Sequence, residues 1–213
     1  MGKSFKYNTK TNGSKKFDDI EVSKTMSWIL RHGLVECFDN KFIGLDGTVP
    51  LDLFLSCPRI NKYNMDFDSI QKIVESNDKQ RFRLENIDGM WRIGANQGHS
   101  KTTTELIDPT KLLERIEEPI ELCVHGTSFH AIKLIEKEGL KIMNRTHIHM
   151  ASDYPGTNVI SGARSSSRVF IEINMEKALT DGIIFYRSAN GVILTSGING
   201  ILEPKYFSKI VYK

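Results

Sequence analysis

The chain has 213 residues, of which 39% are hydrophobic and 26% charged, and its formal net charge is +3. These proportions are typical of a soluble globular protein with one large domain or two small ones, and no apolar run approaches the ~20 residues of a membrane span. The net charge is too small to indicate nucleic-acid binding by itself, although a local basic cluster can still bind phosphate. Three widely spaced cysteines without a CxxC pair predict free thiols in a reducing compartment, either cytoplasm or nucleus.

The first half of the chain predicts three helices followed by a hairpin. Residues 1–17 are polar and lack an apolar period, so we expect a flexible tail and ordered structure from about residue 18. Ser23 can cap a helix that ends at Gly33, a short helix should follow Pro50, and a third should begin at Asp66 or Asp68. The runs 81–84 and 90–93 flank an Asp-Gly pair, which is a strong hairpin signal. This order predicts a winged-helix lobe over residues 18–100, a topology that usually binds nucleic acid, although fold alone does not fix function.

The second half is β-rich. Residues 101–118 are polar and predict a linker, after which residues 119–213 should form a second lobe. We expect a strand at 122–124 and an amphipathic helix over 129–138, with Thr127 or Ser128 as its N-cap and Gly139 as its end. Further strands are predicted at 169–171, 183–186, 192–194 and 210–212. The expected fold class is therefore α+β.

Three isolated arginines carry the clearest chemical signal. Arg31-His32-Gly33 closes the first predicted helix, Arg81 opens the first hairpin strand, and Arg145 precedes a His-Ile-His run. Three guanidiniums and one imidazole can hold a phosphate dianion, if the fold brings these segments together. Simpler roles stay open: a basic residue in the last turn of a helix offsets its dipole, and Arg81 could be a solvated strand residue.

The histidine segments allow more than one interpretation. His125-Gly126-Thr127 follows a strand, so it can be a turn into the helix, a place where a ligand approaches the backbone, or both. His147 and His149 would share one face of a strand, which suits a pair of metal ligands, but no third ligand is close in sequence. Because Arg145 would share that face, an anion is favoured over zinc.

Two further polar segments have no single interpretation. Residues 96–100 can be a polar turn or a set of amide and imidazole donors near a sugar or phosphate. Residues 187–192 can be an Asn-Gly turn between two strands, or a cation and small polar groups beside an accessible backbone.

Taken together, these segments resemble the RNA 2′-phosphotransferase family, which removes a 2′-phosphate during tRNA splicing with NAD. The resemblance runs from about residue 22 to the C-terminus, and it depends on seven segments in the family's order and approximate spacing: 23–32, 77–82, 97–100, 125–127, 145–149, 161–164 and 187–192. It implies an N-terminal winged-helix lobe and a C-terminal ADP-ribosyltransferase-like lobe.

The resemblance also assigns site residues. It implies that the phosphate-binding catalytic residues are Arg31, His32, Arg81 and Arg145. It implies NAD contacts by His125, Gly126, Thr127, His149, Ser161, Arg164, Arg187, Ser188, Asn190 and Val192, and RNA contacts by Lys79, Gln97 and His99. Thr146 and Ala163 depart from the Asn and Met that are common in the family, without removing a charged group.

The implied reaction has two steps and needs no metal. A 2′-phosphate oxygen of the RNA attacks the anomeric carbon of the nicotinamide ribose and nicotinamide leaves; the ribose 2″-hydroxyl then attacks phosphorus. The products are 2′-hydroxyl RNA and ADP-ribose 1″,2″-cyclic phosphate. The expected partners are NAD, consumed as a co-substrate, and 2′-phosphorylated RNA such as ligated tRNA, with the protein acting as a monomer away from membranes.

Two other classes of function remain as alternatives. A nucleic-acid-binding module would leave His125, His149 and Arg187 without a role. A protein ADP-ribosyltransferase would favour a glutamate where Val192 stands, and Glu203 is eleven residues further on.

Overall fold

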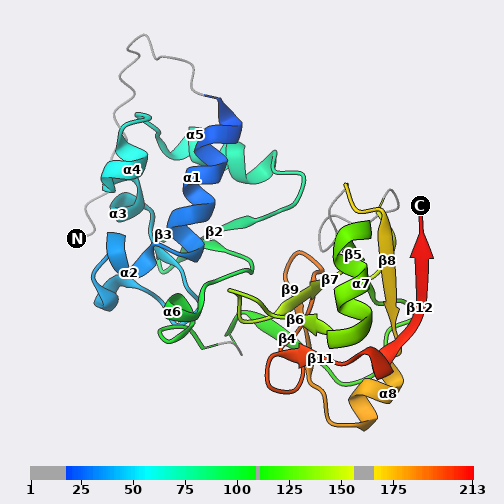
Figure 1. Ribbon diagram of the computed structural model, residues 1–213. Helices are drawn as coiled ribbons and strands as arrows, with labels where there is room; N and C mark the ends of the chain where they lie inside the picture. Colours follow the sequence, from blue (N-terminus) through cyan, green and yellow to red (C-terminus); the bar gives the residue numbers. More distant parts are fainter. Residues whose placement is uncertain (1–17, 109–110, 156–165) are drawn as a thin grey trace.

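The computed structural model describes residues 18–108, 111–155 and 166–213 and forms two lobes that lie side by side (Figure 1). The expected flexible tail lies outside the described residues. The first lobe contains α1 (Asp19–Arg31), α2 (Leu34–Cys37), η1 (Asn40–Phe42), β1 (Val49–Pro50), α3 (Leu51–Ser56), α4 (Pro58–Asn61), α5 (Phe67–Glu75), β2 (Phe82–Ile87), β3 (Met90–Ala95) and α6 (Lys101–Thr104).

The second lobe contains most of the strands. Its elements are β4 (Leu113–Ile116), β5 (Val124–Thr127), α7 (Phe129–Glu138), β6 (Leu140–Lys141), β7 (Ile148–Met150), β8 (Val169–Ile173), α8 (Met175–Thr180), β9 (Phe185–Ser188), β10 (Ile193–Thr195), β11 (Ile201–Leu202), η3 (Pro204–Tyr206) and β12 (Phe207–Tyr212). The mixture of helices and sheets confirms the expected α+β class.

Helix α1 begins one turn earlier than expected. Asp18, not Ser23, is its N-cap, and the Asp18 carboxylate accepts a hydrogen bond from the Ile20 amide at 3.0 Å. Acidic residues in the first turn, Asp19 and Glu21, complement the positive end of the helix dipole and favour this earlier start. The helix ends at Arg31, and the next turn passes so close to Trp28 that a Cβ on Gly33 would lie 2.4 Å from the indole ring.

The predicted hairpin is present. Strands β2 and β3 pair antiparallel from Phe82↔Ala95 to Ile87↔Met90, and Asp88 and Gly89 between them both have positive φ, at 52° and 83°. Positive φ at both central residues matches the twist of a two-residue hairpin turn. Strand β1 pairs with β3 to complete a three-stranded sheet. Buried side chains from α1, α3, α5 and this sheet form one hydrophobic core.

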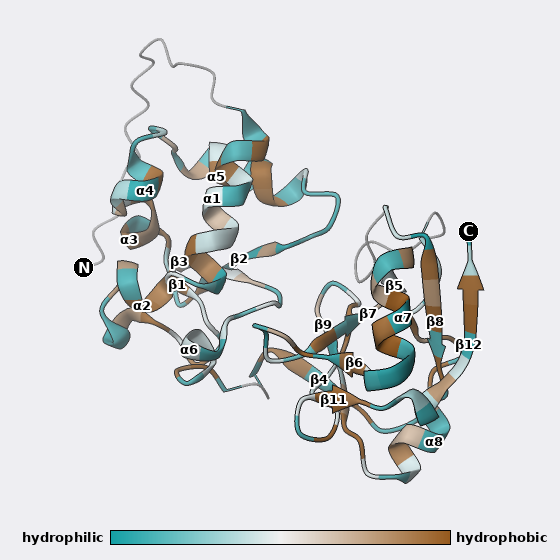
Figure 2. Cartoon of the chain, in the orientation of Figure 1, coloured by the Kyte–Doolittle hydropathy of each residue, from teal (hydrophilic) through white to brown (hydrophobic). Residues whose placement is uncertain are grey.

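The second lobe has a separate core between two sheets and their helices. The strand orders are β4-β9-β10-β7 and β12-β8-β5, and a bridge between Val124 and Ala151 joins the two sheets. Strand β8 and much of β12 are hydrophobic (Figure 2), and all but one of the five β8 residues are buried. Helix α7 has the predicted bounds, with Ser128 as N-cap and Gly139 at φ 80° after its end.

Several boundaries differ from the expectation. The strand expected at 122–124 begins at Val124, and the one expected at 183–186 covers Phe185–Ser188. Residues 101–118, expected as a linker, contain α6 and β4; Ile107 belongs to the first core, and β4 pairs with β9 of the second lobe. Leu112 still packs against the first core and β4 begins at Leu113, so the chain enters the second lobe at the start of β4. Among the described residues, no helix is both long and apolar enough to cross a bilayer.

Candidate active site

Arg31 is held at the boundary between the lobes by the backbone of its own lobe. Its carbonyl, at the end of α1, accepts hydrogen bonds from the Ser100 amide at 2.8 Å and the Thr103 hydroxyl at 3.1 Å. A Cβ on Gly98, which has φ 86°, would lie 3.5 Å from the guanidinium carbon, so this glycine lies in contact with the Arg31 side chain. Neither Nε nor Nη2 of Arg31, both buried, has a hydrogen-bond partner among the residues that the structure describes.

Arg81 reaches the same place from the turn before β2. The Asn77 side-chain oxygen accepts from the Arg81 amide at 3.2 Å and from its Nη1 at 3.3 Å. The Asn96 amide group donates to the Gln80 carbonyl at 2.6 Å, and Gln80 has φ 42°, which is unusual for a residue other than glycine. Three hydrogen bonds with two asparagine side chains thus fix the turn that presents Arg81.

Arg145 approaches from the second lobe, between β6 and β7. Its Nη1 lies 3.3 Å from Nδ1 of His149, on β7. Burial first, then the charges of Arg81 and Arg145, lower the pKa of Arg31 to about 10. Burial, Arg31 and Arg145 lower the pKa of His32 below its ordinary value. The structure therefore brings together all four residues of the expected phosphate site, three from one lobe and Arg145 from the other.

A chain of histidine contacts lies beside this cluster. Nδ1 of His125, on β5, lies 2.9 Å from the His149 carbonyl; because a carbonyl only accepts, Nδ1 carries the proton and the ring is held in one orientation. Nε2 of His149 contacts Oε1 of Gln97, in the first lobe, at 2.8 Å. Burial, Arg145 and weaker effects lower the pKa of His149 to about 3, so the ring is neutral. Gly126 and Thr127 follow His125 on β5, and all three are half-buried.

The segment after β9 is a compact loop whose polar side chains bond within the protein. Ser188 donates to Oδ1 of Asn190 at 2.8 Å and accepts from the Val192 amide at 3.1 Å. All three residues are buried, whereas Arg187 is exposed and lies opposite Glu114 in the β4–β9 pair. The Asn190 amide group donates to the Lys79 carbonyl, in the first lobe, at 2.9 Å. Ser161 and Arg164 lie outside the described residues.

The three residues expected to contact RNA lie at the boundary between the lobes. Gln97 and His99 are buried, while Lys79 is half-buried. Burial, followed by the charges of Arg31 and Arg83, lowers the pKa of His99 to about 3, and within the described ranges its buried Nε2 has no hydrogen-bond partner. Gln97 and His99 line a cavity of about 30 Å³, which is enough for about one water molecule. RNA binding by these residues stays a prediction.

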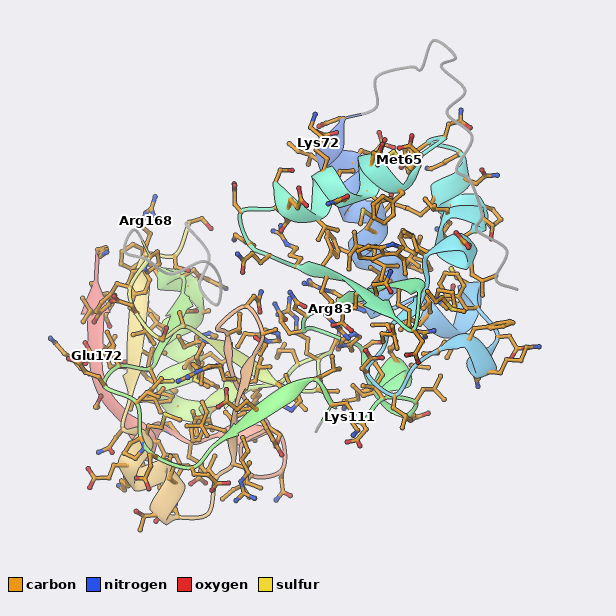
Figure 3. The ribbon with its side chains drawn as sticks, turned by 180° about the vertical axis from the view of Figure 1, so that it is seen from behind. Met65, Lys72, Arg83, Lys111, Arg168 and Glu172 are labelled. Carbon is orange, nitrogen blue, oxygen red and sulfur yellow. The ribbon has the colours of Figure 1, made fainter. Side chains whose placement is uncertain are left out.

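Arg83 contrasts with the arginines of the cluster. It lies on β2 at the side of the first lobe that faces the second (Figure 3). Its guanidinium contacts Asp46 Oδ2 at 3.0 Å and Glu85 Oε1 at 2.7 Å, and also donates to two carbonyls. Its charge is compensated within the protein, so Arg83 is a structural arginine, whereas two buried donor atoms of Arg31 make no hydrogen bond with the described part of the chain.

His147, just before β7, and His149, on β7, do not converge on a shared site in this geometry. His147 lies edge-on to Tyr186, with ring centroids 6.0 Å apart, while His149 contacts Arg145 and Gln97. Within the described ranges, no group of three His, Cys, Asp or Glu side chains could hold a metal ion. The contacts of His149 with a cation and an amide suit an anion site better than a metal.

The sequence analysis missed the asparagines that position Arg81. Asn77 and Asn96 bond to the turn from within the first lobe. Both lie in segments that the sequence singled out, but neither was predicted to position Arg81. A local signal exists for Asn77, because Asn side chains commonly bond to the backbone of the turns that they begin. For Asn96 no local signal exists, since its partner is sixteen residues away.

Comparison with known proteins agrees with this geometry. A family model described as RNA 2′-phosphotransferase, Tpt1 / KptA family, matches residues 18–197. A putative tRNA 2′-phosphotransferase of Schizosaccharomyces pombe is 40% identical over 91% of this chain and 51% of its own length. The tRNA 2′-phosphotransferase 1 of Bos taurus is 42% identical (90% of this chain, 74% of that protein), and that of Homo sapiens is 40% identical (90% and 75%).

The chain thus spans about half the length of the fission-yeast relative and three quarters of the mammalian ones. The family match covers all four residues of the cationic cluster and the segment from His125 to Val192. Since it extends over most of the chain, and relatives about 40% identical align across nine tenths of it, the chain belongs to the RNA 2′-phosphotransferase, Tpt1 / KptA family.

Proposed function

We propose that this protein is an NAD-dependent RNA 2′-phosphotransferase that transfers the internal 2′-phosphate of ligated tRNA to NAD. The observation that carries the proposal is the Arg31 guanidinium beside Arg81 and Arg145: its Nε and Nη2 are buried and make no hydrogen bond with any described residue. Buried like charges are costly unless an anion compensates them, and a phosphate dianion offers both the charge and the acceptors. The relatives are named tRNA 2′-phosphotransferases, which supports a 2′-phosphate of RNA as the anion, and the family name supports transfer of this phosphate.

The arrangement of the lobes suits this assignment. We interpret the first lobe, with its helices followed by the β2–β3 hairpin, as a winged-helix module that binds RNA. We interpret the second lobe as ADP-ribosyltransferase-like, with His125, Gly126 and Thr127 contacting NAD at β5. The anchored Nδ1 of His125 supports this role, because it fixes the ring orientation before a ligand arrives.

The chemistry needs charge compensation more than proton transfer. In the first step a 2′-phosphate oxygen attacks the anomeric carbon of the nicotinamide ribose, and nicotinamide leaves. The attacking oxygen is already anionic, so no base is needed, and a valine at position 192 is compatible with the reaction. In the second step the 2″-hydroxyl attacks phosphorus and the RNA 2′-hydroxyl leaves. Charge builds on the phosphate oxygens in this step, and the arginine cluster offsets it.

The test is product analysis with purified protein, NAD and an RNA that carries one internal 2′-phosphate. We expect nicotinamide, 2′-hydroxyl RNA and ADP-ribose 1″,2″-cyclic phosphate in equal amounts. The same RNA without the 2′-phosphate is the matched control and should release no nicotinamide. Loss of the phosphate as inorganic phosphate, or its transfer without consumption of NAD, would contradict the proposal.

A further inference from the structure

The loop after β9 makes a contact across the lobe boundary that points to a role different from ligand binding. Nδ2 of Asn190 donates to the Lys79 carbonyl at 2.9 Å, across 111 residues of sequence. Lys79 lies two residues before Arg81, in the turn that presents that arginine to the phosphate cluster. This hydrogen bond therefore joins the second lobe directly to the backbone that carries Arg81.

The Asn190 side chain is fixed by its own loop. Its Oδ1 accepts from the Ser188 hydroxyl at 2.8 Å, so the amide orientation is set and Nδ2 must face Lys79. The Ser188 oxygen in turn accepts from the Val192 amide, and the Gly191 amide donates to the Ser188 carbonyl at 2.8 Å. Gly191 has φ 76°, which this tight turn requires and which glycine adopts without strain.

Burial argues against a ligand at these side chains. Asn190 is 5% exposed and Ser188 3% exposed, and both polar atoms of the Asn190 amide already have protein partners. A bound dinucleotide could use them only by breaking the contact with Lys79 or the loop itself. The resemblance-based assignment of Ser188 and Asn190 to NAD is therefore less consistent with the geometry than a role within the protein.

We propose that Asn190 is a positioning residue: through the Lys79 carbonyl it sets the place of Arg81 relative to Arg145 and His149. Within the first lobe, Asn77 and Asn96 hold the same turn. They fix Arg81 on its own lobe, whereas the Asn190 bond connects the same turn to the second lobe. Ser188 holds the Asn190 side chain through its hydroxyl group and therefore affects Arg81 only indirectly. This inference depends on the proposed function, because it assigns Arg81 to the phosphate.

The first test separates positioning from cofactor binding by steady-state kinetics. Asn190→Asp keeps the size and the acceptor for Ser188 but turns the donor that faces Lys79 into an acceptor. We expect kcat to fall about tenfold with the KM for NAD within twofold of wild type. A KM for NAD raised tenfold or more with kcat preserved would overturn the proposal and restore Asn190 as an NAD ligand.

A double-mutant cycle tests the route through Arg81. In an Arg81→Ala background, Asn190→Asp should have less than a twofold further effect, because the group that it positions is absent. Asn174→Ala is the matched control: it removes an asparagine side chain that caps α8, in the same lobe, where Nδ2 plays no part at the boundary. The control should leave kcat unchanged. Independent, multiplicative effects of Arg81→Ala and Asn190→Asp would refute the proposal.

Hydrogen exchange gives a readout that does not depend on activity. Asn190→Asp should increase amide exchange in residues 77–82, while exchange in α7 stays at the wild-type rate. Unchanged exchange in 77–82 would overturn the positioning role even if activity falls. If the wild-type protein releases no nicotinamide, the proposed function fails, and exchange alone decides whether Asn190 orders the Arg81 turn. Should Asn190→Asp fail to fold, Asn190→Ala in the same measurement replaces it.

Discussion

Replacing Arg31 by glutamine should make the ligand-free protein more stable while it abolishes phosphate transfer. Burial, then Arg81 and Arg145, lower the pKa of Arg31 to about 10, a shift that corresponds to about 3 kcal/mol of unfavourable free energy for keeping the charge in the folded protein. Part of this cost is offset, since a cation in the last turn of α1 gains about 0.3–1 kcal/mol from the helix dipole. We expect a net gain of about 2–3 kcal/mol, or about 4–12 °C in Tm.

The assay is thermal unfolding with and without inorganic phosphate. Phosphate should raise the Tm of the wild-type protein, by an amount that corresponds to about 2.7 kcal/mol at one hundred times its Kd, and should have little effect on Arg31→Gln. The matched control is Arg83→Gln, which removes an arginine that is 16% exposed and paired with Asp46 and Glu85. Breaking such a pair leaves a carboxylate uncompensated and should cost about 3 kcal/mol.

The two arginines should therefore have opposite effects on stability. If Arg31→Gln lowers Tm as much as Arg83→Gln does, and phosphate does not stabilise the wild type, Arg31 is a structural residue. The proposed anion site would then be wrong, because it depends on two Arg31 donors that make no hydrogen bond with the described residues.

Three other changes test the remaining residues. Arg145 is exposed in the ligand-free protein, and its contact with a bound phosphate would be shielded from solvent only in the complex. Arg145→Ala should then lower 2′-phosphate removal by orders of magnitude in a folded protein, because truncating one member of a charge pair that is buried in the complex costs roughly 2–5 kcal/mol; near-normal turnover at saturating RNA would reject the assignment. Arg81→Ala should slow the second step more than the first, so a quenched time course should show that ADP-ribosylated RNA accumulates. If the overall rate falls but this species does not accumulate, Arg81 acts in binding or in the first step. His99 and His149 have folded pKa values of about 3, below the ordinary histidine value, so their contribution to the free energy of unfolding is fully present above about pH 6.5 and falls as the pH drops toward 3. At pH 5 the loss should be about 2 kcal/mol for each ring. In pH-dependent unfolding, His99→Gln should reduce the slope of stability against pH.

The sequence predicted best those elements that local interactions determine. Helix α7 was expected with its observed bounds, because a Ser cap, an apolar period and a terminal glycine all act within ten residues. The hairpin was expected for the same reason, since its turn imposes the register. Strand β4 was missed: a four-residue edge strand has little pattern of its own, and its pairing partner β9 lies about seventy residues away.

The residues of the candidate site also divide into those that local sequence predicts and those whose contacts depend on distant parts of the chain. The residues of the cationic cluster could be named from their motifs, but their convergence depends on which lobe faces which, and no local pattern contains that information. The bond from Asn190 to Lys79 spans 111 residues and involves a backbone carbonyl, which has no sequence signature. The burial of Gln97 and His99 was also not predictable, because polar side chains in a turn are usually exposed.

The division of the cluster between lobes suggests how the enzyme recognises its substrate. Arg31 and Arg81 come from the first lobe and Arg145 from the second, so their mutual repulsion acts across the boundary that the bonds of Asn190 and Gln97 hold together. A phosphate dianion in the cluster would reverse the sign of that interaction and attract both lobes. An RNA without the 2′-phosphate leaves the repulsion in place, however well its backbone fits the first lobe. Discrimination between spliced RNA with and without the phosphate would then follow from charge compensation at the site. The repulsion within the cluster opposes the binding of every RNA, and only an RNA that carries the 2′-phosphate offsets it.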